Sequence, residues 1–437
     1  MSPFTFLFGM ALLSFAITNV AILKRVAIWS FIGSIVLVIF GFTTPLYTFS
    51  ASEGVLLFEI IVFIVLGAIV LSEDETITIT QTLFIASASI LLLESTTLLS
   101  FIVSFELMSI LSFILVSNIH NAKEAEGAIK MFIAGSVATA ILFLGATLYI
   151  FSQNSLDSAI AEHLNGFGIV GVCLMLVALF YKLTIVPMHT WAADSYVELR
   201  PLEAGLLSGV VKTVVLVATF KFFSAFVLEN ISFTSPIFIT LALITMSLGN
   251  ILALFQKRVT KILAYSSIAH AGYMLLGFVA VASTYASDGV LYMAIAYIFM
   301  QSAVFVLLDK LSFGKGDILL TDLYAFAKKD KWSALFLSVQ LFSLAGIPLL
   351  AGFLAKAVMV YAVVDAGFTI VALITLLNSA LSVGYYAWII KHIYFDTQES
   401  SYLFEKLTKP SYITQIILVL GTLYFGVFAT TILGITL

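Results

Sequence analysis

Four ionisable side chains lie within stretches of sequence that are otherwise apolar. They are Glu106, Lys182, Lys212 and Lys356. A charge held at the depth of a bilayer costs at least ~2.5–3.5 kcal/mol, so it persists where a function or a partner compensates for it. A surrounding of low polarity favours the neutral form of such a group, whereas a close opposite charge favours the charged form. A carboxyl group and three amines in this setting can therefore take up and release protons without a cofactor.

Two of these lysines accompany interruptions of a helical pattern. Lys182 lies five residues before Pro187, which lacks a backbone donor and should break the helix there. A second interruption, Gly346-Ile347-Pro348, lies eight residues before Lys356 when counted from Pro348. Paired interrupted helices are typical of an ion site near the middle of the membrane.

Each charged residue also has a purely structural interpretation. A single buried lysine could extend its amine to the membrane interface or form a pair that only stabilises the fold. A set of three lysines and one glutamate on four predicted helices favours a transport function over that interpretation. A membrane subunit that has kept the fold and lost conduction is still an alternative.

The composition indicates the kind of protein that must position these residues. Of the 437 residues, 62% are hydrophobic and 10% are charged, which is far from the composition of a soluble domain. The single cysteine, Cys173, excludes a disulfide framework and a cysteine metal cluster. The sequence has no glycine-rich phosphate loop, dinucleotide fingerprint or iron–sulfur motif. We therefore predict a polytopic membrane protein without a redox centre.

A membrane-spanning helix needs about 20 mostly apolar residues. On this basis we predict an all-α fold with about 14 transmembrane helices, at residues 4–23, 27–48, 54–72, 78–96, 98–117, 128–151, 168–197, 203–227, 235–254, 262–282, 288–309, 333–362, 366–394 and 412–434. The first segment is flanked by Lys24 and Arg25 and is expected to be an anchor rather than a cleavable signal.

The two interrupted segments occupy matching places in the order of the helices. In five-helix blocks at residues 78–227 and 235–394, each interrupted helix is the fourth member. Because five is an odd number, the second block would be inverted in the membrane. We therefore predict three N-terminal helices in residues 1–77, two inverted five-helix repeats, and a loop with the last helix in residues 395–437.

The basic residues predict an orientation. Apart from Lys182, Lys212 and Lys356, Lys and Arg fall almost wholly in the loops that follow odd-numbered segments or at the helix ends beside them. At the loops that follow even-numbered segments we assign only Lys221. The positive-inside rule places the lysine-rich loops in the cytoplasm and both termini on the periplasmic side. The expected location is a bacterial inner membrane. Asp309 and Lys310 are interpreted as a simple cytoplasmic helix end, and Glu59 is a membrane carboxyl group without an assigned role.

Polar residues near the first break and in segment 262–282 are candidates for a proton relay. His189 follows Pro187 closely and could relay protons or donate to a backbone carbonyl at the break. Four further candidates lie in the run AYSSIAHAGY: Tyr265, Ser266, Ser267 and His270. This strip could hold water, or it could make hydrogen bonds between helices.

Four runs of sequence carry a resemblance to a known family. They are FELMSI (105–110), YKLTIVPMHTWAADSY (181–196), KILAYSSIAHAGYMLLG (261–277) and SLAGIPLLAGFLAK (343–356). Together they resemble the antiporter-like membrane subunits of respiratory complex I, and most of all subunit N, the NADH dehydrogenase subunit 2 family. The resemblance covers roughly residues 80–395. The chain departs from the family pattern at Ala193-Asp194 and at Glu198-Leu199-Arg200-Pro201, where the family usually has Pro-Asp and a proline-rich turn.

The resemblance implies a role for each charged residue. Glu106 and Lys182 match the residues that form the family's modulating ion pair, and Lys212 matches its central lysine. Lys356 matches the terminal residue of the proton path. The sister subunit M is expected to carry glutamate at that position, so lysine favours subunit N.

The resemblance further implies a proton-translocating, non-redox subunit of a complex I–type NADH:quinone oxidoreductase. No cofactor is expected in this chain, because FMN, iron–sulfur clusters and quinone would belong to partner subunits. Subunit M and the small membrane subunits J and K are the expected neighbours, and no nucleic acid is expected to bind. A subunit of a Mrp-type cation/proton antiporter or of a membrane-bound hydrogenase is the main alternative, since these share the fold and nearly the same motifs.

Overall fold

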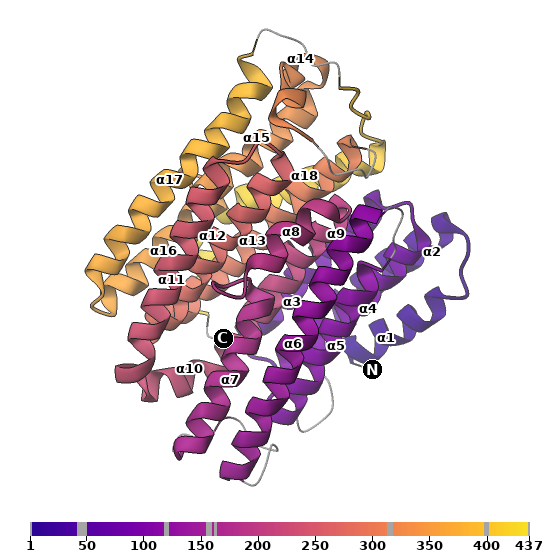
Figure 1. Cartoon of the computed structure of the whole chain (residues 1–437). Helices are drawn as coiled ribbons and strands as arrows, with labels where there is room; N and C mark the ends of the chain where they lie inside the picture. The colour runs from indigo at the N-terminus through magenta and orange to yellow at the C-terminus, as the bar shows by residue number, and fades with distance from the viewer. Residues whose placement is uncertain are drawn as a thin grey trace.

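The computed structural model describes residues 2–41, 50–117, 122–153, 160, 164–312, 318–396 and 402–435. The elements in these residues are α1 (Pro3–Ser14), α2 (Val20–Ile39), α3 (Glu53–Ser72), α4 (Thr76–Glu94), α5 (Leu98–Leu115), α6 (Ala122–Gln153), α7 (Gly166–Leu183), α8 (Thr190–Glu198), α9 (Pro201–Gly205), η1 (Leu206–Val211), α10 (Lys212–Glu229), α11 (Ile231–Leu254), α12 (Val259–Val279), α13 (Ala286–Leu311), η2 (Leu320–Leu323), α14 (Phe326–Lys329), α15 (Lys331–Ala345), α16 (Ala351–Asp365), α17 (Thr369–Tyr394), α18 (Lys409–Val427) and η3 (Ala429–Thr431). Figure 1 shows them as one helical bundle.

Twelve helices in the described part of the chain are long and apolar enough to cross a membrane. The continuous helix from Pro201 to Glu229, formed by α9, η1 and α10, is one of them. Two further predicted segments correspond to shorter helices, namely α1 and the interrupted pair α15 and α16. The prediction of an all-α polytopic membrane protein is confirmed.

The N-terminal prediction is wrong in its boundaries. Segment 4–23 is not one helix, because α1 ends at Ser14 and α2 begins at Val20. The Asn19 side chain accepts hydrogen bonds from the N–H groups of Ala21 and Ile22, which caps a new helix within the apolar run. Lys24 and Arg25 therefore lie inside α2, and residues 42–49 of the predicted second segment lie outside the described residues.

Helix α13 lies at the centre of the bundle (Figure 1). It is buried along its whole membrane-spanning length and packs against α3, α9, α10, α12, α15, α16 and α18. Peripheral helices instead expose apolar side chains, as α6 does with Ile129, Phe132, Ile133 and Val137. Such faces suit lipid or the apolar surface of a neighbouring membrane subunit.

Helices α6 and α7 approach each other at two glycines. A Cβ atom on Gly145 would lie 2.6 Å from the Gly171 carbonyl oxygen, and one on Gly171 would lie 2.7 Å from the Gly145 carbonyl oxygen. Small residues allow this close packing between membrane helices. The contact fixes α7, which carries Lys182 in its last turn.

Candidate functional site

The first interrupted helix, α7, ends one residue after Lys182. Thr184 then adopts left-handed backbone angles (φ 59°), and its N–H group donates to carbonyls of the last turn. Pro187 cannot continue the backbone hydrogen-bond pattern, so the chain leaves the helix and starts again in α8. The indole N–H of Trp191 donates to the Tyr181 carbonyl at 3.1 Å and holds α8 against the end of α7. The predicted break is confirmed.

Lys212 lies opposite this break with its side chain fully buried. Its Nζ donates to Thr184 Oγ1 at 2.8 Å, to Ser267 Oγ at 2.6 Å and to the Ser267 carbonyl at 3.1 Å. The π-helical turn Leu206–Val211 ends directly before Lys212, and such turns are frequent at functional sites. The Lys212 amine on α10 therefore donates hydrogen bonds to oxygen atoms of the first break and of α12. Oxygen acceptors are the partners that an ammonium group needs, because it carries only donors.

Lys182 and Glu106 are neighbours without a direct hydrogen-bonded ion pair in the described structure. Lys182 Nζ is buried without a hydrogen-bond partner there, and it lies 5.3 Å from the centroid of the Phe113 ring. The Glu106 carboxylate accepts from Thr139 Oγ1 at 3.0 and 3.1 Å. The two charges still interact electrostatically. The two groups are thus separate sites within electrostatic range of each other, and the ring face partly stabilises the amine.

The second break holds Lys356. Helix α15 ends at Ala345 and is capped by Gly346, whose left-handed angles (φ 90°) allow the turn before Pro348. The last carbonyls of α15 have no intrahelical partner and carry partial negative charge. Lys356 Nζ donates to two of them, Leu344 at 3.0 Å and Ala345 at 3.2 Å, and to Ser379 Oγ at 3.3 Å. The helix break is therefore the main partner of this lysine.

His270 lies between the two hydrogen-bonded lysines. Its Nδ1 is paired with the Ser266 carbonyl at 2.9 Å, while its buried Nε2 has no hydrogen-bond partner in the described part of the chain. The ring is within electrostatic range of both Lys212 and Lys356, and it lies next to the Leu344 carbonyl that Lys356 contacts. Lys212, His270 and Lys356 thus form a buried row.

The remaining candidates for the proton relay lie in different surroundings, and not all of them are near the buried row. Ser267 contacts Lys212, and the Ser266 hydroxyl is paired with the Tyr386 hydroxyl on α17. Tyr265 is only partly buried and lies towards Asp194, outside the row. His189 stands at the start of α8, where its buried Nδ1 has no hydrogen-bond partner among the described residues.

Several residues of the site were missed from the sequence. Thr184, Thr139 and Ser379 are hydroxyl partners of charged groups. A further polar cluster surrounds Asn250, whose amide donates to the Asn378 carbonyl at 3.0 Å and whose Oδ1 accepts from the Tyr385 hydroxyl at 3.1 Å. Asparagine in an apolar membrane helix was the available signal, since such residues usually pair across helices.

A buried ion cluster surrounds Arg200 near the connection between α8 and α9. Its guanidinium group donates to Asp309 at 2.9 Å and to Glu73 at 3.0 Å, and it lies 3.2 Å from Glu75. Burial opposes the charge of Arg200, but Asp309 and the two glutamates outweigh it and raise the Arg200 pKa above its usual value. The interpretation of Asp309 as a simple helix end was therefore wrong, because its carboxylate is buried in this cluster.

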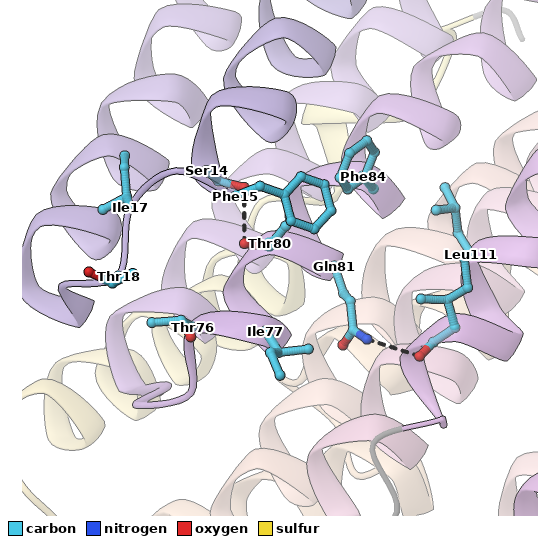
Figure 2. A pocket seen from close by; sticks show the side chains of 11 residues that line it. Ser14, Phe15, Ile17, Thr18, Thr76, Ile77, Thr80, Gln81, Phe84 and Leu111 are labelled. Atoms are coloured by element: carbon cyan, nitrogen blue, oxygen red, sulfur yellow. Dashed lines mark hydrogen bonds between the residues drawn. The ribbon is translucent and has the colours of Figure 1, made fainter.

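Two of the cavities among the described residues lie between helices of the bundle. One of about 520 Å³ lies beside Lys356 and extends along α16 and α17; its lining includes Tyr273, Val360, Val364, Thr375 and Ser379. The other, of about 490 Å³, lies among the α1–α2 connection, α4 and α5 (Figure 2). There Ser14 Oγ donates to Thr80 Oγ1 and Gln81 donates to the Ile114 carbonyl, both at 2.9 Å. Of these two cavities among the described residues, the first borders Lys356 and the second has no ionisable residue of the row in its lining.

Fold and site together define a polytopic membrane protein with buried amines at two interrupted helices. Residues 95–382 match the family described as NADH:quinone oxidoreductase/Mrp antiporter, transmembrane, and the chain belongs to this family.

Individual relatives agree with this assignment. F420H2 dehydrogenase subunit N of Methanosarcina mazei is 31% identical over 79% of this chain and 73% of that protein. NADH-quinone oxidoreductase subunit N of Trichlorobacter lovleyi is 30% identical over 90% of this chain and 85% of that protein. A chain of respiratory complex I from Thermus thermophilus has the same fold, with a TM-score of 0.86 and 23% identity over 98% of this chain and 96% of that chain. The resemblance to subunit N is confirmed.

Proposed function

We propose that this chain is a proton-translocating membrane subunit of a complex I–type NADH:quinone oxidoreductase. The observation that carries the proposal is the buried row of Lys212, His270 and Lys356, with Lys182 and Glu106 at its start. Subunits named for NADH:quinone oxidoreductase among the relatives support the choice of parent enzyme. The chain contributes translocation, while FMN, iron–sulfur clusters and quinone belong to partner subunits.

The first step concerns Lys182. Its amine is buried and has no hydrogen-bond partner in the described structure, so burial disfavours its charge while the Glu106 carboxylate favours it. A charge change in a neighbouring subunit that draws Glu106 away would leave Lys182 as an unpaired buried cation, which low polarity disfavours. Lys182 would then release its proton towards the break, where Thr184 already contacts Lys212.

The second step runs along the row. Lys212 passes a proton towards His270, whose Nε2 is free to accept one, and His270 lies near the Leu344 carbonyl that Lys356 contacts. Lys356 borders the cavity along α16 and α17, which provides a way out. Because the predicted orientation puts the α16–α17 connection on the periplasmic side, protons would leave there, and both termini would face the periplasm of a bacterial inner membrane.

Each interrupted helix ends in a left-handed residue shortly before a proline: Thr184 before Pro187, and Gly346 before Pro348. This likeness supports two related five-helix units at residues 78–227 and 235–394, with flanking parts at 1–77 and 395–437. The expected neighbours are other membrane subunits of the same complex, with M, J and K the predicted ones.

Alternative parent complexes follow from the family and its members. The family also includes Mrp antiporter subunits, and one relative is named as a subunit of F420H2 dehydrogenase. To test the parent complex, the chain is affinity-tagged in its native membrane, the co-purified subunits are identified, and quinone reduction is assayed with NADH and with F420H2. Flavin and iron–sulfur subunits with NADH-dependent activity support the proposal. Antiporter subunits, hydrogenase subunits or activity with F420H2 alone would move the chain to another complex.

A further inference from the structure

A buried amide on α11 lies next to two residues that line the cavity beside Lys356. Asn250 is fully buried, and its helix packs against both α12 and α17 (Figure 1). A Cβ atom on the preceding residue, Gly249, would lie 2.5 Å from the backbone nitrogen of Ala269 on α12. This close approach of two helix backbones, which a small residue permits, holds the backbone of Asn250 against α12.

The Asn250 side chain attaches α17 at two points. Its Nδ2 donates to the Asn378 carbonyl at 3.0 Å, and its Oδ1 accepts from the Tyr385 hydroxyl at 3.1 Å. Asn378 and Tyr385 lie about two helical turns apart, so both are on the face of α17 that meets α11. Two attachments on one face fix the rotation of α17 about its own axis.

The rotation of α17 decides where Ser379 points. Ser379 follows the attached Asn378 directly, and its Oγ accepts from Lys356 Nζ at 3.3 Å. Because side chains project radially from a helix, a rotation of α17 would carry this hydroxyl away from the amine. The contact between Ser379 and Lys356 therefore depends on the attachment at Asn250.

The same amide reaches the tyrosine that faces the Lys356 amine. Asn250 Nδ2 donates to the Tyr273 hydroxyl at 3.4 Å, and Lys356 Nζ lies 5.1 Å from the centroid of the Tyr273 ring. A ring face at this distance attracts a cation. Asn250 thus holds Tyr273 directly and Ser379 through its neighbour in the chain.

We propose that Asn250 is a positioning residue for proton release at Lys356. It keeps the Ser379 hydroxyl and the Tyr273 ring at the amine by fixing α17 against α11 and α12. Asn250 itself takes up no proton, because its side chain is an amide that donates and accepts hydrogen bonds without titrating. This role rests on the proposed function, since it concerns the last residue of the proton path.

Proton translocation per quinol formed, measured with the complex in liposomes, tests this role. Asn250→Leu keeps the branched shape of the side chain and removes its hydrogen bonds to α12 and α17. Translocation should fall roughly 2- to 10-fold, the effect of losing one neutral hydrogen bond. It should remain above that of Lys356→Met, because the helix-end carbonyls still contact the amine. Quinone reductase activity of the intact complex is the assembly control.

The double variant of Asn250→Leu and Ser379→Ala separates positioning from a general structural effect. If Asn250 acts through Ser379, the double variant retains a larger fraction of translocation than the product of the fractions retained by the single variants. A fraction equal to that product or below it would overturn the proposal, as would wild-type translocation in Asn250→Leu. Thr234→Val is the control on α11 and should translocate as wild type, because its buried hydroxyl donates to the Val227 and Asn230 carbonyls at the other end of the helix.

Tyr385→Phe gives the same comparison if Asn250→Leu does not assemble. It removes the hydroxyl that donates to Asn250 and keeps the ring. Its fold loss of translocation should be smaller in the Ser379→Ala background than in wild type, and an equal fold loss in both would overturn the proposal. Wild-type translocation in Lys356→Met is a distinct result, since it would refute the proposed function on which this role rests.

Discussion

Replacing Thr184 with valine removes one acceptor from the Lys212 amine and nearly keeps the shape of the side chain. The amine loses the 2.8 Å contact and keeps its two contacts with Ser267. A hydrogen bond to a charged group contributes ~1.5–3 kcal/mol. Because about 1.4 kcal/mol corresponds to a factor of ten, the ratio of protonated to neutral Lys212 should fall roughly 10-fold or more. We expect proton translocation per quinol formed to fall accordingly.

The assay uses the complex reconstituted in liposomes, with quinol formation and lumen acidification measured in the same sample. Thr184→Ser keeps the acceptor and should behave as wild type. Thr219→Val is the matched control on α10, because the Thr219 hydroxyl is buried without a hydrogen-bond partner in the described structure. Wild-type coupling in Thr184→Val, or an equal loss in Thr219→Val, would refute the reasoning.

Five further substitutions, which make three predictions, test other parts of the structure. Lys356→Met should abolish proton translocation in the liposome assay. Ser379→Ala removes only the 3.3 Å contact with Lys356 and should reduce translocation less. Equal effects of the two variants would argue against the helix-end carbonyls as the main partners of Lys356. Arg200→Met leaves buried carboxylates unpaired and should destabilise the chain by ~3–5 kcal/mol. The complex should then dissociate at a lower temperature, and an unchanged dissociation temperature would contradict the role of the Arg200 cluster in stability. Thr139→Val removes the hydrogen bond to the Glu106 carboxylate and should lower proton translocation several-fold, and Glu106→Gln should lower it further. Translocation at the wild-type ratio in both variants would remove Glu106 from the path.

Much of the fold follows from local properties of the sequence. Long apolar runs give the spanning helices, and Pro187 and Pro348 mark the two interruptions because proline lacks the backbone N–H that a helix interior uses. The lysines stand out because ammonium groups are rare in such runs. These signals need no knowledge of which helices touch.

The rest depends on contacts between distant parts of the chain. The serine and threonine partners of the lysines are common in membrane helices, so their type alone does not select Thr184 or Ser379. Arg200 and Asp309 are 109 residues apart, and nothing local indicates that they meet. At the N-terminus, the Asn19 cap divides an apolar run that a hydropathy window treats as continuous. The separation of Lys182 from Glu106 likewise follows from tertiary packing.

The central claim is that protons cross the membrane through the buried row. The most direct measurement compares proton translocation per quinol in liposomes containing the wild-type complex and the Lys212→Met variant, at equal complex content. The account predicts that the variant assembles, because methionine fits an apolar interior, and that its translocation falls well below wild type. Translocation at the wild-type ratio in the assembled variant would contradict the account, since no step along the row could then require the Lys212 amine.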